Sequence, residues 1–279
     1  MTTTPTPRSP YTRRAVIGTL AAAAVGTPIL LNSQSAIAAP APAASTPAWH
    51  PVPSTDGLKA YEGLEFDRAN LFPSRHSDYI YVEDNDHYRF NIWRNDRDST
   101  GGGDRQRTEA KGMVQNGSAI KMTNGQTWNI SYQMYMPSTL HGTSKFTHIF
   151  QTKIPSTNAG PFVTLDLTRE SSTSETLRAR AYANSGSPTI ASTPLGPLRN
   201  TWVTIQWTLT IGSAGSARFV CIDSTGKTKC DGTMKKVNIP DQGDYVRPKW
   251  GIYRSVESAS SDIVDTYILF RDYQATRTK

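Results

Sequence analysis

The segment Asp104-Arg-Gln-Arg-Thr-Glu-Ala-Lys-Gly-Met113 carries a charged side chain at every second position from 105 to 111. Uncharged Gln, Thr and Ala stand between the charges. In a β-strand, successive side chains point to opposite faces of the sheet, so a repeat of two residues is typical of a strand. The segment is therefore predicted to form a strand over 105–113 with one charged face and one uncharged face.

The same repeat recurs from residue 60 onward, in runs that Gly, Pro, Asn and Ser separate. No long amphipathic helical window and no repeat of fixed length interrupts these runs. Many strands without helices are compatible with a sandwich, a jelly roll or a barrel, and the length favours an all-β jelly roll. We expect a concanavalin-like β-sandwich with a concave substrate groove. The predicted strands are His87–Arg94, Arg105–Met113, Thr127–Met136, Phe146–Ile154, Phe162–Thr168, Thr176–Ala183, Thr201–Ile211, Ala217–Ser224, Lys249–Arg254 and Asp265–Ala275.

The N-terminus has the three parts of a signal peptide over residues 1–39. A basic start with the pair Arg13-Arg14 precedes an apolar run, and a small-x-small sequence ends at Ala39. The arginine pair is typical of the twin-arginine route, so we expect export, with an N-terminal anchor as the alternative. Residues 40–55 are predicted to form a disordered leader. Residues 56–279 would then be a single secreted domain, monomeric and free of the membrane.

The charge balance argues against a nucleic-acid partner. Lys and Arg number 30 against 23 Asp and Glu, but three arginines lie in residues 1–39, which hold no acid, so 27 − 23 = +4 remains for the rest. That excess lacks the dense Lys/Arg stripe of a duplex-DNA binder, while a groove for an acidic polymer is compatible with it. The five histidines show no spacing typical of metal ligands, so we predict neither a metal nor a cofactor.

The only two cysteines, Cys221 and Cys230, flank Thr225-Gly226. A two-residue turn at Thr225-Gly226 would set the cysteines opposite each other as a non-hydrogen-bonded pair with close Cα atoms. We therefore expect a disulfide in an exported protein, with two free thiols as the alternative.

The strand predicted over 105–113 gathers Arg105, Arg107, Glu109 and Lys111 on one face. A core cannot hold that set unless every charge is satisfied, so the face is either a solvated surface or a polar groove. In a groove, Arg107 would bind an anionic group, because a guanidinium matches a carboxylate, and Glu109 would orient the cations.

The segment 145–153 presents Gln151 and Lys153 on one face, and strict alternation places His148 on the other with two phenylalanines. That arrangement makes His148 a core histidine, although a β-bulge would reverse it. In the segment 247–254, Gly251 separates Lys249 from Tyr253. The missing side chain would let a ligand approach the backbone and reach the phenol; the alternative is that Tyr253 only stacks within the sheet.

These three segments, in this order, resemble the secreted jelly-roll polysaccharide lyases over about residues 60–275. Alginate lyases of this fold carry Arg-(Ser/Thr)-Glu-(Leu/Val)-Arg, Gln-(Ile/Val)-His and Tyr-x-Lys-x-Gly-x-Tyr-x-Gln. Glucuronan lyases and heparin-lyase-like proteins are similar at greater distance. The sequence departs from the pattern at Lys153, which stands where the alginate lyases have His.

The resemblance implies β-elimination on a uronic-acid polymer. Arg107 and Gln151 would stabilise the charge that develops on the sugar carboxylate. Tyr253 would act as the acid and sometimes also as the base, which requires neighbouring cations to lower the pKa of the phenol. The departure at Lys153 leaves the base unassigned. Lys153 could still neutralise the carboxylate, and His148 or His87 could reach the groove from an altered register.

His87 also shares a predicted strand face with Arg89, Asn91 and Trp93. This face is either a sugar subsite or an exposed surface. The alternative to a lyase is a non-catalytic carbohydrate-binding module of the same fold, with Trp93, Tyr135 and Tyr182 as its platform. A glycoside hydrolase is disfavoured because no pair of carboxylates stands out and Glu109 lies among cations.

Overall fold

The computed structural model describes residues 47–99, 103–156, 160–171 and 174–279, which belong to one compact unit. The predicted signal peptide, residues 1–39, lies outside the described residues. No helix in the described ranges has the length and apolar character needed to cross a membrane.

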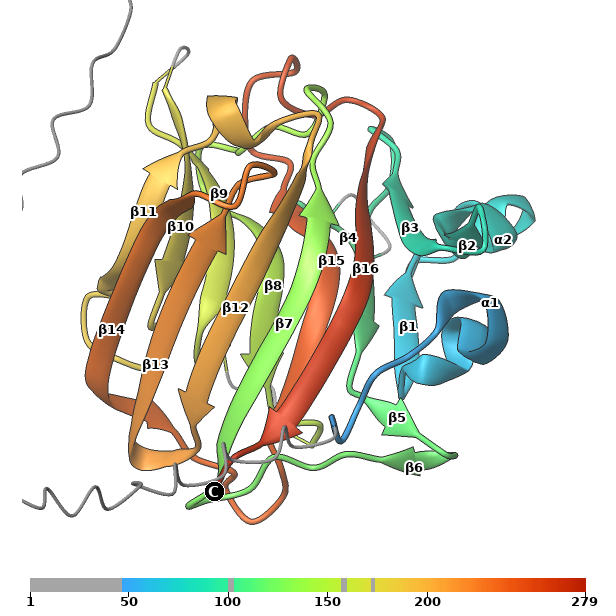
Figure 1. The fold of residues 1–279 in the computed structure, drawn as a ribbon. Helices are drawn as coiled ribbons and strands as arrows, with labels where there is room; N and C mark the ends of the chain where they lie inside the picture. The colour runs from blue at the N-terminus through green and yellow to red at the C-terminus, as the bar shows by residue number, and fades with distance from the viewer. Residues whose placement is uncertain (1–46, 100–102, 157–159, 172–173) are drawn as a thin grey trace, which may run out of the picture. The chain divides into compact units, whose positions relative to one another are not determined.

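Two seven-stranded antiparallel sheets pack face to face (Figure 1). The first sheet has the order β1 (Gly63–Phe66), β4 (Arg105–Lys111), β15 (Arg247–Ser255), β8 (Thr147–Lys153), β9 (Thr164–Arg169), β10 (Glu175–Arg180) and β11 (Thr189–Pro194). The second has the order β14 (Thr228–Ile239), β13 (Gly212–Ile222), β12 (Trp202–Thr210), β7 (Thr127–Tyr135), β16 (Thr266–Arg277), β3 (His87–Ile92) and β2 (Ile80–Glu83).

The remaining elements are short. A small hairpin joins β5 (Val114–Gln115) to β6 (Ser118–Ala119). The helical pieces are α1 (Pro53–Asp56), α2 (His76–Tyr79) and the 3-10 turns η1 (Gly57–Ala60), η2 (Pro73–Arg75) and η3 (Gly196–Leu198).

The all-β jelly-roll sandwich predicted from the sequence is confirmed, and each of the ten predicted segments contains a strand. Three strands of four or more residues were missed, namely β1, β2 and β11, and only the start of β14 was implied by the hairpin expected at Thr225-Gly226. Strand β11 lies at the edge of its sheet and ends at Pro194. Proline has no N–H group and is tolerated on an edge strand, so the sequence of β11 does not resemble that of a central strand.

The core between the sheets is rich in aromatic residues. Trp250 of the first sheet lies 5.1 Å, ring to ring, from Tyr273 of the second. Trp49 stacks on Trp250 at 5.2 Å and is fully buried. The backbone N–H groups of Ala48 and Trp49 also bond to the carbonyl of Ala275. From residue 47 onward, the chain therefore differs from the disordered leader expected over 40–55, because Trp49 completes the core.

The β13–β14 hairpin places Cys221 opposite Cys230, as predicted, but by another route. The Gly226 N–H bonds to the Asp223 carbonyl, and the Asp223 N–H bonds to the Lys227 carbonyl, so three residues form the loop instead of two. A register shift between Cys221 and Ile222 restores the expected pairing. The predicted disulfide is not formed, since both cysteines are free in the structure.

Both thiols are expected to react slowly in the native protein, because burial raises the pKa of Cys221 to about 12 and that of Cys230 to about 11. The thiolate is the reactive species, and very little of it exists at neutral pH. A chromogenic disulfide reagent should therefore titrate two thiols rapidly in denaturant and only slowly under native conditions. A count of zero in denaturant without reductant would show that the bridge forms after all.

Candidate active site

The outer face of the first sheet gathers the three polar segments singled out in the sequence. Strand β15 lies between β4 and β8. Tyr253 stands opposite Arg107 of β4, and Lys249 stands opposite both Lys111 of β4 and Gln151 of β8. The predicted convergence of these segments on one face is therefore present.

Register shifts between β8 and its two neighbouring strands bring His148 to this face. Lys249 pairs with Gln151 and Tyr253 pairs with His148, so two partners four residues apart on β15 meet residues only three apart on β8. The β8–β9 ladder shifts register at the same place, between His148 and Phe150. His148 thus stands on the Tyr253 face, because strict alternation fails at the register shift. It is buried, as predicted, at 5% exposure, and stacks on Phe146 at 5.0 Å, but it does not share the face of Phe150.

His148 has a carboxylate partner that sequence reasoning missed. Its Nδ1 lies 2.6 Å from Oδ1 of Asp166, a β9 residue that is 1% exposed. An ionised carboxylate only accepts hydrogen bonds, so Nδ1 carries a proton, and in the neutral imidazole the lone pair is then on Nε2. The His148 ring lies 5.8 Å from the Tyr253 ring and 5.5 Å from the Tyr182 ring.

Tyr253 is held from two sides by arginines. Nη1 of Arg105 donates a hydrogen bond of 2.8 Å to the phenol oxygen. The guanidinium of Arg107 lies 3.9 Å from the centroid of the ring. Phe146 closes a third side at 5.1 Å, ring to ring. The packing fixes the ring, and the hydrogen bond from Arg105 fixes the position of the phenol oxygen.

Arg107 is not free to bind an anion as predicted. Its Nη1 donates to Glu65 at 2.9 Å and to Glu109 at 3.1 Å, and its Nη2 donates to Asp98 at 3.3 Å. Three carboxylates thus occupy the guanidinium, which acts as a positioning group beneath Tyr253. Arg105 also pairs with a carboxylate, Asp104, at 2.6 and 2.8 Å, but both side chains are exposed, at 40% and 47%, so a ligand can reach this arginine.

Glu109 is the centre of a buried ion cluster. Its carboxylate accepts from Lys249 at 2.7 Å and from Gln151 at 2.5 Å, in addition to Arg107. Burial alone would raise the pKa of Glu109, but Lys249 and Arg107 outweigh it and hold that pKa below its usual value. Gln151 is 1% exposed, and its side-chain amide donates a hydrogen bond to Glu109. The contact with substrate that was predicted for Gln151 is therefore not available.

Glu65 of β1 is the second carboxylate of this cluster. It stands opposite Glu109 and accepts from Lys249 at 2.6 Å and from Lys111 at 3.0 Å. Burial raises the pKa of Glu65, whereas Lys249, Arg107 and Lys111 lower it far below its usual range. Sequence reasoning missed Glu65 together with its four-residue strand.

Replacing Glu109 by Gln should destabilise the protein by about 3–5 kcal/mol at pH 7, because two buried cations lose their shared counter-charge. The folded-state pKa of Glu109 lies below 4.5, its ordinary value. The ionised carboxylate therefore stabilises the fold above pH 4.5, and this contribution is lost as the pH falls toward the folded-state pKa. Urea unfolding at pH 7 and at successively lower pH should show the Glu109→Gln difference shrink.

The matched control is Asp231→Asn, which breaks an exposed pair with Arg218 on the second sheet. This variant should change the unfolding midpoint only slightly, since exposed ion pairs contribute little. If Glu109→Gln behaved like Asp231→Asn, the cluster would not contribute to stability in the way its contacts indicate.

Gly251 has a structural reason that differs from the predicted gap for a ligand. Its φ is 135°, and a Cβ there would stand 2.1 Å from the Thr108 carbonyl oxygen of the neighbouring strand. The glycine is required by the close approach of β4 to β15 and by the backbone conformation at the register shift with β8.

Lys153 lies apart from Tyr253. It stands opposite Arg247, six residues along β15 from Tyr253, so it does not take the place of a base beside the phenol. Burial and the neighbouring cations Lys249 and Arg107 lower the pKa of Lys153. Lys153 lines a cavity of about 230 Å³.

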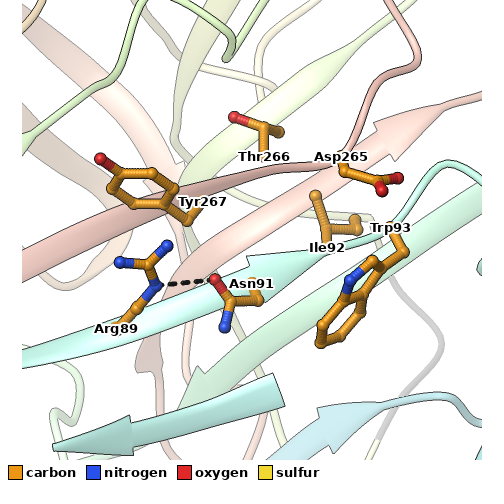
Figure 2. Close-up of a pocket in the computed structure, with 7 residues that line it drawn as sticks. All are labelled: Arg89, Asn91, Ile92, Trp93, Asp265, Thr266 and Tyr267. Atoms are coloured by element: carbon orange, nitrogen blue, oxygen red, sulfur yellow. Dashed lines mark hydrogen bonds between the residues drawn. The ribbon is translucent and has the colours of Figure 1, made fainter. Parts of the chain in front are cut away.

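The predicted sugar platform of His87 and Trp93 lies on the other sheet. His87 is 8% exposed and bonds Glu83 at 3.0 Å. Figure 2 shows Trp93 with Arg89, Asn91 and Tyr267 around a pocket of about 320 Å³ between β3 and β16. The substrate-binding roles predicted for His87 and Trp93 are therefore wrong for the Tyr253 site, because β3 and β15 belong to different sheets.

No protein-family model matches the sequence, and no curated protein matches it either. Within the described ranges, no three His, Cys, Asp or Glu side chains gather closely enough to hold a metal ion.

The fold is the jelly roll seen in solved polysaccharide lyases, as the sequence resemblance implied. A family 7 alginate lyase in complex with substrate matches with a TM-score of 0.55 and 15% identity, covering 81% of this chain and 96% of that one. An alginate lyase from Pseudomonas aeruginosa gives 0.53 and 14%, covering 79% and 99%. A PL-14 alginate lyase from Aplysia kurodai gives 0.50 and 15%, covering 83% and 99%. Identities of this size establish the fold alone.

Proposed function

We propose that the protein is a secreted lyase that cleaves a uronic-acid polysaccharide, such as glucuronan or alginate, by β-elimination. The observation that carries the proposal is the pairing of His148, bound to Asp166, with Tyr253, bound to Arg105, on one sheet face. A base and an acid with separate orienting partners are what the elimination requires. The jelly-roll fold shared with alginate lyases supports it.

In this proposal His148 is the base. Its Nε2 takes the proton from C5 of the uronate, and the C5–H electron pair forms the C4=C5 double bond. Asp166 holds the proton on Nδ1 and stabilises the imidazolium that results. The carboxylate that lies next to C5 makes this proton hard to remove, so a cation must balance the developing charge.

Arg105 and Tyr253 complete the reaction. The half-exposed Arg105 guanidinium neutralises the sugar carboxylate, a role that the sequence assigned to Arg107. The C4–O4 bond breaks, and the departing oxygen takes the proton of the Tyr253 hydroxyl. The electron pair of that bond leaves with the oxygen, and no water is consumed. The phenolate left on Tyr253 is stabilised by its bond from Arg105 and regains a proton from solvent.

The test is to incubate the purified protein with polyglucuronate, alginate and other uronate polymers and to follow the ultraviolet absorbance of the new double bond. Growth of that absorbance with at least one polymer is expected. Tight binding without absorbance would instead support a non-catalytic carbohydrate-binding module. If the protein bound no acidic polymer and produced no absorbance with any of them, both the lyase and the binding module would be overturned.

Export of the protein by the twin-arginine route remains part of the proposal, and it rests on the sequence of residues 1–39. Cleavage after Ala38 or Ala39 would release the chain with Trp49 still available to the core. N-terminal sequencing of the extracellular protein measures this directly.

A further inference from the structure

A cavity of about 230 Å³ lies beyond Arg107 on the outer face of the first sheet. Five cationic side chains and a single carboxylate line it. The lining residues are Glu65, Arg68, Arg107, Lys153, Ile154, Pro155, Arg247 and Lys249.

Four of the five cations already have carboxylate partners. Arg107 and Lys249 share Glu65 and Glu109. Arg68 pairs with Asp98 at 3.4 Å, and Arg247 pairs with Glu62 at 2.8 Å.

Lys153 is the exception. Within the part of the chain that the structure describes, its ammonium group has neither a hydrogen bond nor an ion pair with another side chain. It stands among like charges, because Arg247 is its neighbour across the ladder and Lys249 and Arg107 line the same cavity.

The charges do not cancel. The cluster counts six cations, with Lys111 added to the five of the lining, against the four carboxylates of Glu62, Glu65, Asp98 and Glu109. An unpaired ammonium surrounded by arginines and a lysine gains most from an added anion, since Coulomb attraction is strong in a partly buried site.

We propose that this cavity is a second anion-binding subsite, in which Lys153 receives the carboxylate of a uronate unit other than the one that reacts at His148 and Tyr253. The inference rests on the proposed function. It makes the substrate a polymer with acidic groups on successive units, since a lone uronate in a neutral chain would fill only one of the two positions.

The two positions are well separated. Arg247, the partner of Lys153, stands six residues along β15 from Tyr253, a backbone separation of about 20 Å along a strand. Arg107 stands between them, with its guanidinium against the Tyr253 ring on one side and the cavity on the other. The Arg107 guanidinium therefore separates a carboxylate bound in the cavity from a sugar ring at the phenol.

The first experiment is calorimetric titration of sodium glucuronate into the wild type, Lys153→Gln and the control Lys235→Gln. Lys235 is an exposed lysine of β14 on the second sheet. The wild type and the control should bind alike, and Lys153→Gln should bind about tenfold more weakly at the cavity. Since burial and neighbouring cations lower the pKa of Lys153, a bound carboxylate should raise it and cause proton uptake at alkaline pH.

Proton uptake is read from titrations in two buffers that differ in protonation enthalpy, and it should disappear in Lys153→Gln. No glucuronate binding by the wild type, or equal affinity and equal proton uptake in Lys153→Gln, would overturn the subsite. With a polymer that is cleaved, Lys153→Gln should raise KM more than it lowers kcat.

The two proposals fail separately. If glucuronate binding depends on Lys153 but no polymer gives an unsaturated product, the anion subsite is supported and the lyase proposal is wrong. Elimination with a KM that is the same in Lys153→Gln and wild type would keep the lyase and remove the subsite.

Discussion

Tyr253→Phe is expected to lose at least about a thousandfold in kcat against the polymer that the wild type cleaves. The substitution removes one oxygen and leaves the ring, so the stacking with Arg107 and the packing on Phe146 remain. General acid catalysis contributes about 10²–10⁴ in rate, and the departing O4 has no other proton donor of comparable placement in the proposed mechanism. Initial rates from ultraviolet absorbance, at saturating polymer, measure the loss.

Tyr267→Phe is the matched control, because Tyr267 also stacks under an arginine, Arg89 at 3.8 Å, but on the second sheet. It should keep the wild-type rate. Tyr267→Phe should keep the wild-type unfolding midpoint, and Tyr253→Phe should lower it only slightly, since it loses the hydrogen bond from Arg105 but no ring contact. A Tyr253→Phe variant with more than a tenth of the wild-type kcat would rule out the phenol as the acid.

The fold was predictable because its signal is local. A run of alternating side chains, such as 105–113 or 127–136, indicates a strand by itself, whatever the rest of the chain contains. The segments that were missed carry little of that signal. Glu65 lies in a strand of four half-buried residues, too short for alternation to be read.

The sequence predicted which residues share one face of the sheet, but it did not predict the contacts that these residues make. Alternation brought Arg105, Glu109 and Tyr253 to one side, but a one-residue bulge decides where His148 points, and bulges leave no periodic trace. The role of Arg107 depended on Glu65, which is 42 residues away, and on Asp98, which lies outside every predicted strand.

One signal was overlooked. Asp166 interrupts the otherwise uncharged strand Thr164-Leu-Asp-Leu-Thr168, and a carboxylate in a strand buried on both faces needs a partner. That requirement points to a cation or a histidine on a neighbouring strand, and β8 supplies His148. A buried acid in an apolar context is therefore as informative as the motifs of the charged strand.

His148→Asn is expected to lower kcat about a thousandfold, because the base that removes the C5 proton is gone. Asp166→Asn should cost less, about 10–100-fold, since the imidazole remains and loses only its orienting partner. An amide at position 166 can also donate to Nδ1, which would favour the tautomer with the proton on Nε2. That tautomer cannot accept a proton from C5.

The tautomer is visible in the ¹⁵N resonances of the His148 ring, which should report a protonated Nδ1 in the wild type and a shift of the proton toward Nε2 in Asp166→Asn. A purely structural Asp166 would lower stability without moving these resonances. The matched control is His141→Asn. His141 lies in the loop between β7 and β8, and its Nδ1 is 3.3 Å from the carboxylate of Glu175. Since no reacting group touches His141 in the proposed mechanism, kcat should stay at the wild-type value there. Equal losses in both histidine variants would show that the loss of a histidine–carboxylate pair, and not of the base, lowers the rate.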